Sequence, residues 1–146
     1  MSLSRKIFSV LGVVLLLELA LEFYLIAAAA FSVWGASDDA NSVYSAFKSG
    51  DNYATLHGFI GTLLVPITIV LMLVVAFRAS LSRDQKFLTA GILGLMVIQF
   101  LLGRLALAGG PAALLIGALH GIDALAIVGA SAALVTRTWA FAAESR

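Results

Sequence analysis

The sequence predicts an all-α membrane protein in which four transmembrane helices form one up-down bundle. Of its 146 residues, 62% are hydrophobic and only 12% are charged, and the mean hydropathy is +1.06. Soluble domains carry about 25% charged residues. The apolar residues gather in four runs, each reaching the roughly 20 residues that a spanning helix needs. The whole chain, residues 1–146, is therefore expected to be a single transmembrane domain embedded in a lipid bilayer.

The four predicted helices cover residues 7–33, 52–77, 87–108 and 111–136. The first is an apolar run that contains two carboxylates, Glu18 and Glu22. A signal peptide is the alternative explanation of this run, because basic residues precede it, but the run is about twice as long as the apolar part of a signal peptide. The second and third runs are separated by a basic connection, and the third ends at a glycine pair. The fourth starts at Pro111, whose fixed φ suits the first turn of a helix.

Charges at the helix ends predict the orientation. Basic residues lie at the N-terminus, at the C-terminus and between the second and third helices: Arg5, Lys6, Arg78, Arg83, Lys86, Arg137 and Arg146. The loop formed by residues 34–51 instead carries Asp38, Asp39 and Asp51 against Lys48. The positive-inside rule therefore places both termini in the cytoplasm and the long loop outside, and we expect the bacterial inner membrane. The net charge of +1 resides at helix ends and gives no indication of a nucleic-acid partner.

Two histidines are the most informative residues inside the predicted membrane region. His57 and His120 each stand in a Leu-His-Gly tripeptide. At a rise of about 1.5 Å per residue, His57 lies roughly 8 Å past Asn52 and His120 roughly 14 Å past Pro111. The second and fourth helices are parallel and diagonal in an up-down bundle, so we expect the two rings to face each other across its axis. An imidazole on each side of the iron is what a six-coordinate haem requires.

Small residues near each histidine would leave room for a flat ligand. Gly61 follows His57 by four residues, and Gly117 precedes His120 by three. The alternative is close helix packing, because Gly117 and Gly121 form a small-xxx-small pair. For the two imidazoles, direct pairing, a proton relay or another metal are the alternatives to haem. The chain has no cysteine, which excludes thiolate ligands and covalent haem attachment, and two histidines are too few for a closed zinc site.

Polar residues near the histidines supply candidate supporting roles. Arg104 could hold a haem propionate through two parallel hydrogen bonds, or extend to the surface, or pair with Glu22 or Asp123. Asp123 follows His120 by three residues and could orient its ring, as could Gln99 on the third helix.

Two further carboxylates, Glu18 and Glu22, are four residues apart and therefore share one helix face. They could carry protons to a redox centre or a quinone, or only form hydrogen bonds between helices.

A four-helix unit with histidines near the outer ends of its second and fourth helices resembles one half of haem A synthase, and more loosely the four-helix core of the cytochrome b561 type. The resemblance covers most of the chain, is topological, and implies that His57 and His120 are axial haem ligands. The synthase has two such halves and this chain has one. Many synthases also have a carboxylate or cysteines in the outer loop, whereas here the loop lacks cysteine and Ala54 precedes His57 by about one turn.

These observations predict a membrane b-type cytochrome that binds one haem b and serves electron transfer or haem handling rather than catalysis. A quinone, a redox protein and a second copy of the chain are the candidate partners besides the bilayer. A haem-free scaffold or transporter-like subunit with an internal polar network is the alternative, and a haem-modifying enzyme is a third. The sequence contains no phosphate-binding glycine loop, nucleophile elbow or HExxH motif, which argues against a hydrolase.

Overall fold

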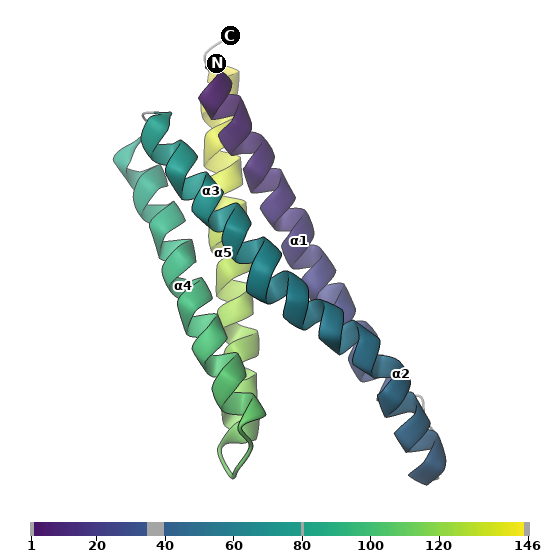
Figure 1. The fold of residues 1–146 in the computed structure, drawn as a ribbon. Helices are drawn as coiled ribbons and strands as arrows, with labels where there is room; N and C mark the ends of the chain where they lie inside the picture. Colours follow the sequence, from purple (N-terminus) through teal and green to yellow (C-terminus); the bar gives the residue numbers. More distant parts are fainter. Residues whose placement is uncertain (1, 35–39, 80, 145–146) are drawn as a thin grey trace. The chain divides into compact units, whose positions relative to one another are not determined.

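The computed structural model describes residues 2–34, 40–79 and 81–144 and confirms the predicted fold class (Figure 1). Within these residues, four helical spans are long and apolar enough to cross a membrane: Leu3–Trp34, Tyr44–Arg78, Arg83–Leu107 and Ala113–Trp139. The elements in chain order are α1 (Leu3–Trp34), α2 (Ala40–Phe59), η1 (Ile60–Leu64), α3 (Val65–Arg78), α4 (Arg83–Leu107) and α5 (Ala113–Glu144). The protein is an all-α, four-helix integral membrane protein.

The predicted start of the second span at Asn52 is wrong, because α2 already begins at Ala40. Hydropathy identifies the residues that can lie in lipid, but a helix ends only where its backbone is interrupted. No proline occurs between residues 40 and 51, so the helix continues through this polar stretch. The loop predicted over residues 34–51 is therefore helical from Ala40 onward, while Asp38 and Asp39 lie outside the described residues.

Local capping moves the ends of the other helices. The third helix starts at Arg83, four residues before the prediction, because Ser82 and Gln85 form a reciprocal capping box that satisfies free N–H groups of the first turn. The fourth starts at Ala113, since Pro111 lies in a turn closed by the Ala113 N–H and the Gly110 carbonyl at 3.1 Å. This connection also needs the positive φ angles of Gly109 and Gly110, +77° and +88°.

A widened helical turn, η1, lies between α2 and α3. Its hydrogen bonds reach five residues back, as in the bond from the Val65 N–H to the Ile60 carbonyl. Pro66 is the second residue after this turn, and a proline ring inside a regular helix would clash with the carbonyl four residues earlier. A π-helical turn is one of the local adjustments by which a membrane helix accommodates a proline.

The chain forms two compact units, which are described separately. The larger unit comprises Met1–Leu16 and Pro66–Arg146, and the hairpin unit comprises Leu17–Val65. The larger unit thus contains the first half of α1 together with α3, α4 and α5, and the hairpin unit contains the second half of α1 with α2 and η1. The expectation of a single domain over residues 1–146 stays a prediction.

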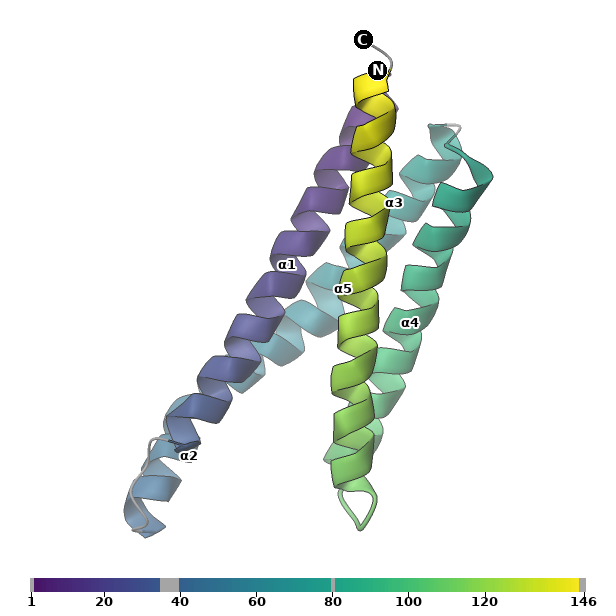
Figure 2. The same cartoon turned by 180° about the vertical axis from the view of Figure 1, so that it is seen from behind.

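In the larger unit, α4 and α5 run antiparallel and side by side from their connecting turn (Figures 1 and 2). Buried positions are three or four residues apart on both helices, which is the spacing of coiled-coil packing: Gln85, Thr89, Ile92 and Met96 on α4, and Asp123, Ile127, Ser131, Leu134 and Thr138 on α5. The register is shown by Gln85 Nε2, which donates to Thr138 Oγ1 at 3.4 Å.

In the hairpin unit, small residues let the two helices approach closely. Gly50 of α2 packs directly on Ala29 and Ser32 of α1. Ser32 Oγ also donates to the main-chain oxygen of Ala46 at 3.4 Å. Close approach through small residues and hydroxyl groups is typical of helix pairs in membranes.

Many polar side chains are buried and many large apolar ones are exposed, the inverse of a soluble protein. Glu22, Thr89, Asp123 and Ser131 are all at least nine-tenths buried, while Leu101 and Leu125 are 59% and 62% exposed. Exposed leucine is stable in hydrocarbon, and a polar side chain there needs a partner within the protein. The distribution supports a membrane environment for the helices.

Substitution of Gly12 tests the packing of the larger unit. A Cβ atom at Gly12 would lie 2.8 Å from Val135 Cγ2, whereas one at Gly91 would meet nothing within 4 Å. We expect Gly12→Leu to lower the free energy of unfolding by about 1–3 kcal/mol through overpacking, and Gly91→Leu to leave it unchanged or raise it. Thermal unfolding in detergent measures both, and equal melting temperatures for the two variants would contradict the packing.

Candidate functional site

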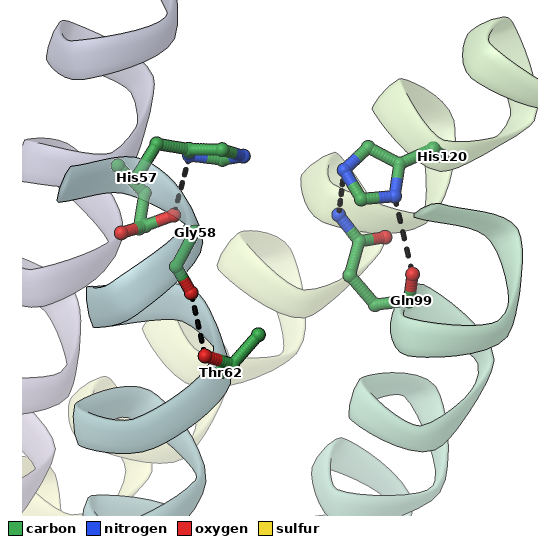
Figure 3. Close-up of polar contacts among 6 residues, drawn as sticks. His57, Gly58, Thr62, Gln99 and His120 are labelled. Carbon is green, nitrogen blue, oxygen red and sulfur yellow. Dashed lines mark hydrogen bonds and ion pairs between the residues drawn. The ribbon is translucent and has the colours of Figure 1, made fainter. Parts of the chain in front are cut away.

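His120 on α5 is held by one residue of α4. Gln99 Nε2 lies 3.1 Å from His120 Nε2, and His120 Nδ1 lies 3.2 Å from the main-chain oxygen of Gln99 (Figure 3). The two residues face each other because α4 and α5 are antiparallel neighbours whose inward positions recur every three or four residues. Both nitrogens of this half-buried imidazole therefore have partners within the larger unit.

The partners determine which nitrogen of His120 carries the proton. A carbonyl oxygen only accepts hydrogen bonds, so Nδ1 must donate to Gln99 O. Nε2 then has a free lone pair and accepts from the Gln99 side-chain amide. With these partners, the neutral form of the ring carries its proton on Nδ1, and Nε2 is its basic atom. This is the tautomer of a histidine that binds a metal through Nε2 while its other nitrogen is held by a carbonyl group.

Gly103 provides the space that this ring occupies. A Cβ atom at position 103 would lie 3.3 Å from His120 Cε1 and 3.4 Å from Nδ1. Any larger residue would press on the imidazole. The sequence analysis missed Gly103, although its position four residues after Gln99 places it on the same face of α4 and could have indicated it.

His57 lies in the hairpin unit and pairs with Glu22 of α1. Its Nδ1 is 2.6 Å from Glu22 Oε2, and the side chains are 28% and 11% exposed (Figure 3). The contact is an ion pair when the ring is protonated, but it is not an aligned hydrogen bond. Gly61 allows it, because a Cβ atom there would lie 3.0 Å from Glu22 Oε2. The space at Gly61, which was predicted to receive a flat ligand, is therefore next to a carboxylate.

The depth predicted for His57 rested on a helix start that is wrong. With α2 beginning at Ala40, His57 lies 17 residues, or about 26 Å, beyond the start of that helix. His120 lies seven residues, or about 10 Å, beyond Ala113. Because residues 40–51 form a polar extension of α2, distance from the helix start does not measure depth in the membrane, and the common level of the two rings stays a prediction.

The remaining predicted residues lie in the larger unit, except for the α1 carboxylates. Asp123 is buried, and its Oδ2 has no hydrogen-bond partner among the described residues. Of the two candidates for orienting His120, Gln99 makes the contacts. Arg104 is exposed in the last turn of α4 and forms no salt bridge with Asp123. Gly117 borders open space, since a Cβ atom there would meet nothing within 4 Å.

Glu18 and Glu22 are four positions apart on α1, and both belong to the hairpin unit. The described residues contain no group of three or more His, Cys, Asp or Glu side chains that could hold a metal ion. A metal bound by protein side chains alone is thus not indicated there, whereas a haem iron needs only two axial ligands because the porphyrin supplies four.

Comparison with protein-family models, with curated proteins and with solved structures finds no match to this chain.

Replacing Gly103 tests how the imidazole of His120 is positioned against α4. We expect Gly103→Val to displace the imidazole and break its Nδ1 bond to Gln99, which lowers the free energy of unfolding by about 0.6 kcal/mol or more, the average for a hydrogen bond between membrane helices. Nitrogen NMR of the ring should show a proton fixed on Nδ1 in the wild type and not in the variant. Gly94→Val, on the same helix with nothing within 4 Å, is the matched control. An unchanged spectrum in Gly103→Val would contradict this position of the His120 ring.

Proposed function

We propose that this chain is a membrane b-type cytochrome that holds one haem b through His57 and His120 and carries electrons or handles haem. One observation supports this most: each imidazole has an oxygen atom of a neighbouring helix beside its Nδ1. For His57 it is Glu22 Oε2, in an ion-pair contact, and for His120 it is the main-chain oxygen of Gln99, in a hydrogen bond. Histidines that ligate metals almost always have such a partner on the second nitrogen, because it orients the ring and raises its basicity.

The residues around each ring fit an iron ligand. His57 Nε2 has no hydrogen bond to a described residue, and His120 Nε2 contacts only the end of a flexible glutamine side chain. The proposal requires both Nε2 atoms to reach one iron, one from each unit. When bound, the haem would supply a one-electron redox centre whose potential depends on these ligands and their hydrogen bonds.

Arg104 is a candidate partner for a haem propionate. It is exposed, carries no salt bridge within the described part of the chain, and has the planar donor set that binds carboxylates with two parallel hydrogen bonds. The resemblance to one half of haem A synthase, the bacterial inner membrane, and an orientation with the 34–51 segment outside belong to the same proposal. A quinone and a redox protein are the candidate electron partners.

Absorbance tests the proposal directly. Full-length protein expressed with ample haem should show sharp α and β bands after reduction, and both His57→Ala and His120→Ala should lose at least nine-tenths of this absorbance. Gln85→Ala is the matched control, because it removes another contact between α4 and α5 and should keep the bands. Colourless wild-type protein would overturn the proposal, and a modified porphyrin in extracted pigment would favour a haem-modifying enzyme.

A haem-free polar network is the second candidate function. It is favoured by the same pair of contacts that satisfies both nitrogens of His120, since a ring with two protein partners needs no further ligand. In that case His120 and Gln99 join α4 to α5, and His57 and Glu22 join the two helices of the hairpin unit. A scaffold or transporter-like subunit would use them in this way.

Gln99→Leu separates the two candidates. In a cytochrome, the Gln99 amide competes with iron for His120 Nε2, while the main-chain bond to Nδ1 survives the substitution. Haem titration should then give an affinity equal to the wild type or about threefold tighter, which corresponds to about 0.6 kcal/mol for the competing bond. In a haem-free network, the same variant should lower the melting temperature and bind no haem.

A further inference from the structure

One end of the larger unit concentrates positive charge. Gly12, Met72 and Val135 lie at one level, since a Cβ atom on Gly12 would be 2.8 Å from Val135 Cγ2 and 3.6 Å from Met72 Cε. Six or seven residues beyond this level, about 10 Å along the helices, α1 carries Arg5 and Lys6 and α3 carries Arg78. The terminal turns of α1, α3, α4 and α5 lie at this end of the unit (Figures 1 and 2).

The other two helices add three more cations there. The contact between Gln85 and Thr138 lies within one helical turn of Val135, on the side of Arg5, Lys6 and Arg78. Lys86 and Arg137 are next to this contact, and Arg83 begins α4. We call the six residues the basic end: Arg5, Lys6, Arg78, Arg83, Lys86 and Arg137. Asp84 is the one carboxylate among the described side chains in this region, and none of the six cations forms a salt bridge within the described residues.

Aromatic rings connect the basic end to the apolar surface of the helices. Arg83 stands over the ring of Phe87 at 5.1 Å, and Lys86 stands over that of Phe77 at 5.4 Å. These phenylalanines are 62% and 63% exposed. Each pair thus places a cation at the border between polar and apolar surface. A ligand that fits here has an anionic head for the cations and hydrocarbon for the rings and the exposed aliphatic residues beyond them.

We propose that the basic end binds anionic phospholipids of the surrounding leaflet through their phosphodiester groups. Unpaired Arg and Lys side chains at the border of the membrane attract anionic lipid, and the arginine fork binds phosphate oxygens with two hydrogen bonds. Among the described side chains, Asp84 leaves these six cations an excess of five positive charges. A soluble phosphate would use the charges alone, whereas a phospholipid also covers the apolar surface beside Phe77 and Phe87. This binding is independent of haem.

Lipid titration of the full-length protein in detergent tests the proposal. Phosphatidylglycerol should bind and raise the melting temperature more than phosphatidylcholine does, and glycerol 3-phosphate should give no comparable shift. Neutralising the connection between α3 and α4 in Arg78→Gln/Arg83→Gln/Lys86→Gln should weaken phosphatidylglycerol binding by about fivefold for each residue replaced. The affinity of the wild-type protein for phosphatidylglycerol should also decrease with added salt.

A matched variant controls for net charge and folding. Lys48→Glu lowers the net charge by two at an exposed position outside the basic end and should bind phosphatidylglycerol as the wild type does. If the triple variant is unstable, Arg83→Lys, which keeps the charge but removes the fork, should show a smaller loss than Arg83→Gln. Equal binding of phosphatidylcholine and phosphatidylglycerol, or equal loss in the control and the triple variant, would overturn the proposal. A rise in melting temperature with glycerol 3-phosphate as large as that with phosphatidylglycerol would also overturn the proposal.

Discussion

The organisation of this protein depends on one constraint: a polar group in hydrocarbon must find its partner within the protein. The hairpin unit meets this requirement by pairing His57 with Glu22, and the larger unit by pairing His120 with Gln99. Both contacts join two helices, and both depend on a glycine, Gly61 or Gly103, whose missing side chain gives the polar groups room. Small and polar residues therefore act together, because each contact requires a backbone close enough for it to form.

The same contacts are compatible with two functions because a structural histidine and a ligand histidine need the same support. An acceptor at Nδ1 stabilises the ring in the membrane and also leaves Nε2 as the basic atom. The two functions differ in what Nε2 meets, and for His120 that is a glutamine side chain with rotatable bonds. A carboxylate beside His57 and a carbonyl group beside His120 would donate different amounts of electron density to an iron, so the two axial ligands would not be equivalent.

Composition was sufficient to predict four membrane helices, since hydrophobic runs of this length have few other stable structures. The ends of the helices were predicted less accurately. The start of α2 was placed twelve residues late because hydropathy does not register a polar helical extension, and the capping box at Ser82 was overlooked. The histidines and Gln99 were recognised from the sequence because they are rare polar residues in apolar runs. The pairing of His57 with Glu22 was not, because it depends on the relative rotation of α1 and α2, which the sequence of either helix alone does not determine.

The widened turn at Ile60–Leu64 separates the buried residues Ile60 and Val65 by five positions, where a regular helix would use three or four. Such a turn accommodates one residue more than an α-helix of the same length. Removing one residue there would restore the regular period while both flanking helical faces kept their directions. A deletion elsewhere in the helix would instead rotate every later side chain by about 100°. The geometry of this turn therefore favours the loss of one residue there over a loss in the regular helix on either side.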